Sequence, residues 1–476
     1  MVYARIITIA MSEKKIYVPL VIVALLCAVF APIVFMGYLS LNSAEAEFAG
    51  EDFAAAAGSY EYAARLLPWR DDLWEKAGIA FAKSGDENNA IDFLERAPRL
   101  SAEGWMWLGY SHYVVGDFPS SIQALEESLQ LNSQPFTFEL LALIYRSQKN
   151  WSAERDVLQD QIRRDAARGD VHTRYRLGVL LTVLEPEQAL THLMLASSLD
   201  PEFDPAVQTL RAALNLSATQ PDASQQMVTI GRALGLVQEW DLAVAAFEKA
   251  ISLDGENAEA WAWLGEAKQQ VGEEGLAELD RAVSLDHTSV VVRGLRALYW
   301  SRQEKYSQML AEYLLAAEYE PDNPAWQAGI AEAYIKRGDL VAALATYQRA
   351  TELAPNESTY WSLLAVFCAQ NGVHLEDIGL PAAQKAVEIS PDDPSALDAL
   401  GWSYLASGRF ASAEQVLVDV VERFPNQLSA QIHLAMTYLS QGNRSAALDV
   451  LSRVQNVDPD GAYGEMAGQL LKQYFP

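Results

Sequence analysis

The stretch GDLVAALATYQRATELAP, residues 338–355, decides the fold of this chain. Its opening Gly-Asp pair predicts a break between two helices, and its final proline predicts the end of the second helix. Between them, small and large apolar residues share one helical face at positions i, i+4 and i+7, namely Ala343, Tyr347 and Ala350. A matching stripe, Ile330, Ala331 and Tyr334, precedes the break. The stretch is therefore predicted to be the turn and second helix of an antiparallel helical hairpin.

Prolines recur through the second half of the chain at a nearly constant interval. They occupy positions 321, 355, 391, 425 and 459, at spacings of 34, 36, 34 and 34 residues. The apolar and glycine positions recur with them: Leu400, Gly401, Tyr404, Gly408 and Ala413 in one unit, and Leu434, Ala435, Tyr438, Gly442 and Ala447 in the next. A fixed period of this length indicates a repeated two-helix unit.

This pattern resembles that of the tetratricopeptide repeat (TPR) family. The family's W–LG–Y…A…F…A…P positions fall on Trp261, Leu264 and Gly265 in one unit, and on Ala343, Tyr347, Ala350 and Pro355 in another. The resemblance implies an all-α fold, a right-handed α-solenoid of about eleven hairpins. Two units depart from the regular length, since residues 273–285 are two residues short and residues 373–385 two residues long.

An uncharged apolar run, residues 17–41, precedes the repeats. As a helix it would measure about 37 Å, enough to cross a bilayer core of about 30 Å. Basic residues come before it and acidic residues after it, so the N-terminus is expected in the cytoplasm and the repeats outside it. We expect a single-pass protein of the cytoplasmic (plasma) membrane, of bacterial type. A signal peptide cleaved after Ala46 is the alternative, and the start could be Met1 or Met11.

The expected organisation follows from these observations. It comprises a cytoplasmic tail (1–16), a transmembrane helix (17–41), an N-terminal TPR array (42–201), an irregular helical seam (202–220), a C-terminal TPR array (221–459) and a capping helix (460–476).

Charge and composition limit the partners. The 476 residues carry a net charge of -28 and are 50% hydrophobic. Nucleic-acid binding needs clustered Lys and Arg, so it is not expected. An acidic surface fits solubility or a basic partner. The two cysteines, Cys27 and Cys368, indicate no disulfide framework.

The sequence contains no motif that carries chemistry. It has no GxGxxG, no GxxxxGK[ST] and no HExxH, and its six histidines are scattered over different units. The repeats account for nearly all of the chain after the apolar run, so no catalytic domain is expected. We predict a protein that is not an enzyme and uses no cofactor and no metal. An enzyme remains the alternative only through a site in residues 135–220.

The resemblance also implies where a partner binds, because first helices of TPR units line a binding groove. The candidate groove residues are Tyr110, Tyr113, Tyr175, Arg232, Glu332, Ile335, Asp398, Trp402 and Met436. The implied function is a membrane-tethered scaffold that binds protein or peptide segments, basic or apolar in character, with roles in envelope assembly, secretion or polysaccharide export. The alternative is a self-associating, homo-oligomeric component of a membrane complex.

Overall fold

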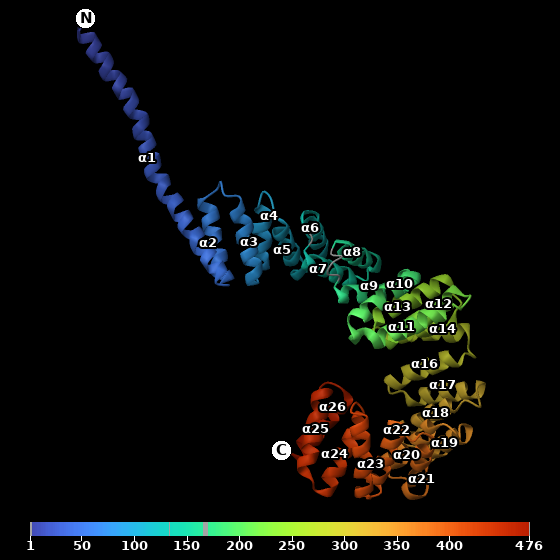
Figure 1. Ribbon diagram of the computed structural model, residues 1–476. Helices are drawn as coiled ribbons and strands as arrows, with labels where there is room; N and C mark the ends of the chain where they lie inside the picture. Colours follow the sequence, from blue (N-terminus) through green and yellow to red (C-terminus); the bar gives the residue numbers. More distant parts are fainter. Residues whose placement is uncertain (1, 133, 165–169, 476) are drawn as a thin grey trace. The chain divides into compact units, whose positions relative to one another are not determined.

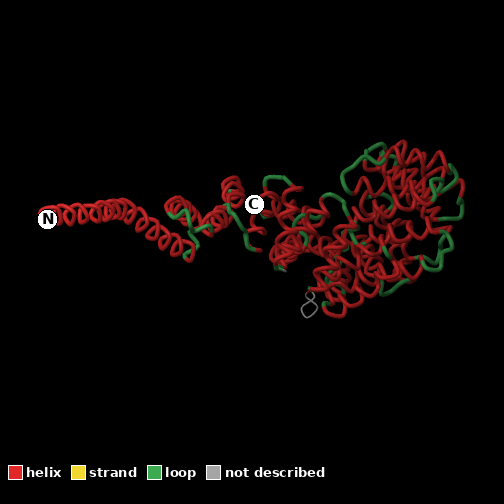
Figure 2. Tube along the Cα trace, turned by 90° about the horizontal axis from the view of Figure 1, so that it is seen from above, coloured by secondary structure: helices red, strands yellow, loops and turns green. Residues whose placement is uncertain are grey.

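The computed structural model describes residues 2–132, 134–164 and 170–475. Within these ranges the chain forms 26 α-helices, one short 3₁₀ turn and one π-helical turn, and no β-strand (Figures 1 and 2). Within each compact unit described below, most successive helices pack against one another. The predicted all-α helical-repeat architecture is confirmed.

The chain divides into two compact units, residues 1–215 and 216–476. The first contains α1 (Val2–Ala49), α2 (Phe53–Leu66), α3 (Asp72–Ser84), α4 (Glu87–Arg96), α5 (Ala102–Val114), α6 (Phe118–Leu131), α7 (Pro135–Ser147), α8 (Trp151–Arg164), α9 (Val171–Leu184), α10 (Pro186–Leu199) and η1 (Pro201–Phe203). Helix α11 (Asp204–Ser217) spans the boundary.

The second unit contains α12 (Ala223–Leu236), α13 (Trp240–Leu253), α14 (Ala258–Gln270), α15 (Leu276–Leu285), α16 (Val290–Arg302), α17 (Tyr306–Tyr319), α18 (Pro324–Lys336), α19 (Leu340–Leu353), α20 (Ser358–Asn371), η2 (Leu375–Gly379), α21 (Leu380–Ile389), α22 (Pro394–Ala406), α23 (Phe410–Arg423), α24 (Leu428–Gln441), α25 (Arg444–Val457) and α26 (Ala462–Tyr474). In both units, apolar cores lie between consecutive helices.

The stretch 338–355 forms the predicted turn and second helix. Gly338 adopts φ +80°, a left-handed conformation that glycine reaches without steric penalty. The Asp339 side chain accepts a hydrogen bond of 3.0 Å from the backbone N–H of Ala342 and caps α19. The stripe Ala343, Tyr347 and Ala350 is buried. The same Gly-Asp device precedes α4 and α6, where Asp86 and Asp117 cap the helices.

Close approach of the two helices in a hairpin explains why small and large residues recur at fixed spacing along the chain. A Cβ added to Gly401 on α22 would lie 2.5 Å from Leu417 Cγ on α23. The equivalent Gly231 on α12 would meet Phe247 on α13 at the same distance. Such overlap is not tolerated in a densely packed core. Gly401 and Gly231 therefore fix how closely their two hairpins close.

Two of the helical repeats have an irregular length, and the structure shows a local cause for each. Where residues 273–285 are short, the second helix is only 10 residues long, α15, instead of the usual 14. Where residues 373–385 are long, a π-helical turn at Leu375–Gly379 takes up the extra residues. Gly379 is required there, because a Cβ on it would lie 2.6 Å from the Cβ of Cys368.

The predicted transmembrane segment 17–41 is part of a single longer helix, α1. The side chains of residues 1–22, 24 and 27 lie outside the described residues, and so does part of this segment. Its C-terminal part packs on α2: Leu41 is buried in the core, and a Cβ on Gly37 would lie 2.7 Å from Leu67 Cγ. Among the described residues, none of the helices combines the length with the apolar composition that crossing a bilayer requires.

Candidate functional site

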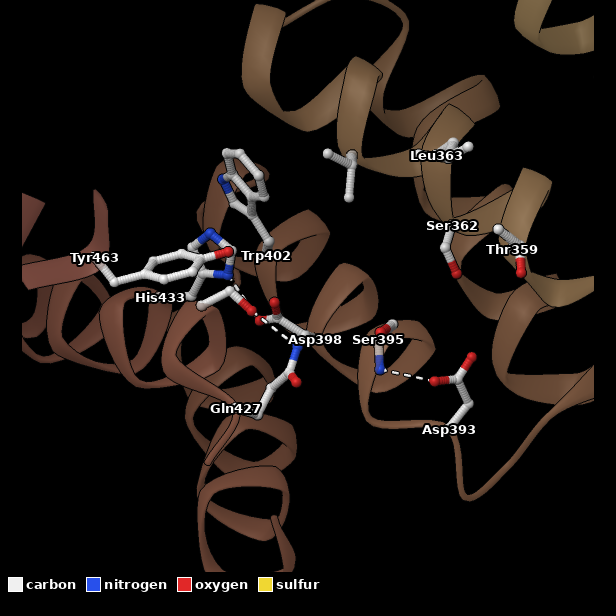
Figure 3. A pocket seen from close by; sticks show the side chains of 12 residues that line it. Thr359, Ser362, Leu363, Asp393, Ser395, Asp398, Trp402, Gln427, His433 and Tyr463 are labelled. Carbon is white, nitrogen blue, oxygen red and sulfur yellow. Dashed lines mark hydrogen bonds and ion pairs between the residues drawn. The ribbon is translucent and has the colours of Figure 1, made fainter. Parts of the chain in front are cut away.

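The first helices of three successive hairpins enclose a cavity in the second unit. Helices α20 and α22 pack together, as do α22 and α24, and the closing helix α26 packs on α24. We call the surface formed by α20, α22 and α24 the first-helix face. The cavity has a volume of about 550 Å³ and opens to solvent. Figure 3 shows the side chains that line it. This volume suits a side chain or a short peptide segment.

A buried acid–imidazole pair lines the cavity. Nδ1 of His433 on α24 lies 2.7 Å from Oδ1 of Asp398 on α22, and the two residues are only 8% and 7% exposed. A carboxylate can only accept, so Nδ1–H donates, and Nε2 of a neutral imidazole is left as an acceptor. The bond occupies one of the two carboxylate oxygens of Asp398. The pair therefore joins two repeats and presents acceptor groups to the cavity (Figure 3).

Aromatic rings form another part of the lining. Trp402 is half-buried and lies one helical turn after Asp398, so both side chains are on the same side of α22. Its ring centroid is 4.2 Å from that of His433. Tyr463, in the first turn of α26, is exposed and completes the lining from another helix. The cavity thus combines flat aromatic surface with carboxylate oxygens.

Two further polar side chains of the lining come from α20 and from the start of α22. Ser362 is buried, and its Oγ has no hydrogen-bond partner among the described residues. Asp393 caps α22, accepting a 2.9 Å hydrogen bond from the backbone N–H of Ser395 (Figure 3). A buried hydroxyl without a partner is uncommon in folded proteins and indicates a position at which a ligand or a water binds.

Of the nine predicted groove residues, the structure brings Asp398 and Trp402 together in this cavity. Four other residues of the lining were not predicted from the sequence: Ser362, Asp393, Tyr463 and His433. A usable signal existed for Ser362, because it stands two residues before Leu364, as Asp398 stands two residues before Leu400. His433 follows Asp398 by 35 residues, one repeat and one residue, so the repeat register alone does not place it opposite Asp398.

The predicted residues of the first unit lie elsewhere. Tyr110 and Tyr113 are half-buried on α5, where their rings pack against Phe136 and Phe118, with centroids 6.0 and 6.1 Å apart. Tyr175, on α9, stacks on Phe203 with centroids 4.3 Å apart. All three tyrosine rings therefore pack against another aromatic ring of the same unit.

None of the other predicted residues of the second unit lines this cavity. Arg232 is exposed, and its guanidinium lies over the ring of Trp263, 5.1 Å from the centroid. Ile335 and Met436 are half-buried and pack against core clusters. Glu332 is exposed on α18.

Glu332 acts electrostatically on two buried tyrosines that belong to the neighbouring helices α17 and α19. Burial raises the pKa of Tyr313 to about 12, and the negative charge of Glu332 adds to that effect. The same two causes, in the same order, raise the pKa of Tyr347 to about 12. The charge of Glu332 therefore lies close enough to both tyrosines to affect their ionisation.

The site offers acceptors for a cationic or hydrogen-donating ligand. Its titratable side chains are Asp393, Asp398, His433 and Tyr463, with no Lys or Arg among the lining residues. Within the part of the chain that the structure describes, no group of three or more His, Cys, Asp or Glu is placed to hold a metal ion. The arrangement supports recognition of a ligand by hydrogen bonds, charge and aromatic contact.

Comparisons with known proteins confirm the nature of the repeats. Models of the tetratricopeptide repeat match residues 228–285, 307–366 and 404–470. The chain therefore contains tetratricopeptide repeats in its second unit, and the last matched range includes Tyr463 and His433 of the cavity. This is a fold suited to protein–protein interaction.

Individual relatives are distant. Superkiller complex protein 3 of Homo sapiens is 23% identical over 339 residues, which is 65% of this chain, and the chain spans 19% of that relative's length. The crystal structure of yeast Tom70 matches with 12% identity and a TM-score of 0.43, covering 92% of this chain and 95% of that one. The structure of pilF from Pseudomonas aeruginosa matches 44% of this chain and 95% of its own, with 14% identity and a TM-score of 0.36.

Proposed function

We propose that this chain is a scaffold that binds a segment of a partner protein on the first-helix face of its second unit. The observation that carries the proposal is the cavity between α20, α22 and α24. It contains the buried Asp398–His433 pair and the hydroxyl of Ser362, which has no hydrogen-bond partner among the described residues. Buried polar groups whose hydrogen-bonding capacity is only partly filled favour a ligand that supplies the missing hydrogen bonds. The partner segment is expected to be extended or helical, since both forms suit a helical groove.

Site-specific photo-crosslinking tests this function in the cells that make the protein. A photoreactive phenylalanine analogue replaces Thr359, an exposed residue that lines the cavity from α20. Mass spectrometry of the crosslinked products then identifies the partner. We expect one or a few protein partners to be captured from this position.

A matched control uses the outer helices of the same unit. The analogue replaces Val341, which is 82% exposed on α19, the second helix of its hairpin. We expect the partners captured from position 359 to be missing from position 341. Capture of the same proteins from both positions, or of none from position 359, would contradict binding at the first-helix face.

We further propose that α1 tethers the repeats to the cytoplasmic membrane as a single-pass anchor, with the repeats on the extracytoplasmic side. Its described surface carries many exposed apolar side chains: Val23, Leu25, Leu26, Val29, Phe30, Ile33, Phe35, Met36 and Leu39. Exposed apolar surface on this scale favours contact with lipid or with another protein. Because Gly37 and Leu41 pack on α2, the residues before Val34 are the ones proposed to enter lipid.

Replacing Leu26 and Phe30 by glutamate tests the tether, since both side chains are exposed and make no core contact. A charged residue near the centre of a membrane helix costs about 2.5–3.5 kcal/mol on insertion scales. We expect the unmodified chain to stay in membranes after alkaline carbonate extraction and the double variant to be released. Release of both chains would argue against the anchor, and protease digestion of intact cells would test its orientation.

The remaining sequence-based expectations stay predictions. They are self-association, the absence of catalysis, and a role in envelope assembly, secretion or polysaccharide export.

A further inference from the structure

The cavity on the first-helix face carries negative charge on its wall. Its lining includes the carboxylates of Asp393 and Asp398 and no basic residue other than His433. The whole chain is also strongly acidic, with a net charge of -28. A concave site with fixed charge of one sign concentrates ligands of the opposite sign. The charge therefore selects a cationic occupant.

The hydroxyl of Ser362 is a second, independent indication of a ligand. It lies on α20, across the cavity from the α24 side chains, and its Oγ is buried without a partner among the described residues. Hydroxyl groups that are buried to this extent in folded proteins normally make a hydrogen bond. A partner segment with N–H donors can satisfy such an acceptor, whereas an apolar segment cannot.

The aromatic and aliphatic parts of the lining suit the rest of such a ligand. The half-buried indole of Trp402 and the exposed ring of Tyr463 can attract a cation through their π faces. Leu363 and Val366 on α20 provide apolar surface for an alkyl stem.

We propose that the cavity binds an arginine side chain of the partner segment, an inference that rests on the proposed scaffold function. A guanidinium is planar, always charged and weakly hydrated, and it presents five donors in a fixed geometry. It can donate to the Asp398 carboxylate while it lies against the ring of Trp402, which is on the same side of α22. An ammonium group concentrates its charge at one point and is more strongly hydrated, so lysine binds less well here.

Peptide binding to the full-length chain in detergent micelles tests the proposal. The probe is a fluorescent, acetylated pentapeptide with arginine between two leucines, and the reference peptide has citrulline, which keeps the shape and removes the charge. Fluorescence anisotropy gives both dissociation constants. Because the arginine peptide offers a charged donor to the Asp398 carboxylate and the citrulline peptide only a neutral one, we expect the arginine peptide to bind at least about tenfold more tightly.

Two variants locate the binding in the cavity. Asp398→Asn removes the buried carboxylate and is expected to weaken arginine-peptide binding by about tenfold while leaving citrulline-peptide binding nearly unchanged. Asp449→Asn makes the same charge change at an exposed position on α25 and is expected to have no effect. The arginine–citrulline comparison uses the unmodified chain, so it stays decisive even if Asp398→Asn impairs folding.

The outcomes separate this inference from the scaffold function. Equal affinity for the arginine and citrulline peptides, or unchanged binding by a folded Asp398→Asn chain, overturns the arginine site. A lysine peptide that binds as tightly as the arginine peptide overturns the assignment of a guanidinium. If crosslinking at position 359 still captures partners in any of these cases, the scaffold function stands without the arginine site.

Discussion

Nδ1 of His433 donates a 2.7 Å hydrogen bond to Oδ1 of Asp398, and this contact links the first helices of two successive repeats. Both side chains are buried, and the indole of Trp402 lies against the imidazole. Repeat proteins are stabilised by interfaces between neighbouring repeats. The same pair therefore serves two purposes: it holds α22 to α24, and it orients the carboxylate that faces the cavity.

Removing one partner of this pair is expected to destabilise the second unit. His433→Leu leaves the Asp398 carboxylate buried without its donor, which costs roughly 1–3 kcal/mol. Urea unfolding followed by tryptophan fluorescence measures the change. The double variant His433→Leu with Asp398→Leu should lose less stability than the sum of the two single variants. Additive losses would show that the two side chains do not interact energetically.

Gly401 is expected to tolerate no larger side chain. Alanine there would place its Cβ 2.5 Å from Leu417, which is itself fully buried and cannot move aside. Overpacking of this kind costs roughly 1–3 kcal/mol. Gly58→Ala is the matched control, because Gly58 lies on α2 with open space around it, and alanine should stabilise that helix by about 0.5–1 kcal/mol. Thermal unfolding of both variants tests the contrast, which would disappear if helix propensity alone decided the outcome.

Features that depend on local chemistry could be predicted from the sequence. Features that depend on the geometry between neighbouring repeats could not. The hairpin turn at Gly338 and its cap Asp339 follow from local chemistry, so they were predictable. The repeat register placed Asp398 and Trp402 on the first-helix face. The meeting of His433 with Asp398 depends on how neighbouring first helices rotate against each other, which no single repeat specifies.

Helix α1 is a second case in which the sequence pattern does not reveal a packing partner. An uncharged run over residues 17–41 fits lipid and protein surroundings equally well, and length and composition do not separate the two. The structure shows that Gly37 and Leu41 contact α2, a packing partner that the sequence pattern did not reveal.

Stability is expected to fall in alkaline solution between about pH 10 and pH 12. Burial, together with the charge of Glu332, raises the pKa values of Tyr313 and Tyr347 from 10.0 to about 12. In that window the unfolded chain releases protons that the folded chain keeps, so the free energy of unfolding decreases as pH rises, by up to about 1.4 kcal/mol per pH unit for each tyrosine. Stability from this source is fully present below pH 10.

Replacing both tyrosines by phenylalanine separates them from the other groups that titrate at high pH. Urea unfolding at pH 9 and at pH 11 gives the change in unfolding free energy for each protein. We expect a smaller loss between these pH values in the Tyr313→Phe, Tyr347→Phe chain than in the unmodified chain. An identical loss in the two proteins would show that these tyrosines do not retain their protons in the fold.

Cys368 is expected to be nearly inert to thiol reagents while the second unit is folded. Burial, with a smaller contribution from the negative charge of Asp377, raises the pKa of its thiol to about 11. At pH 8 only about one thiol in a thousand is then the reactive thiolate. A Cys27→Ser chain leaves Cys368 as the single cysteine, so labelling with a chromogenic disulfide reports on it alone. The rate should rise about tenfold per pH unit from pH 8 to pH 10 in the folded chain, and in urea it should level off above about pH 8.5. Folded and unfolded chains with the same pH profile would show that the pKa of Cys368 is not raised by its surroundings.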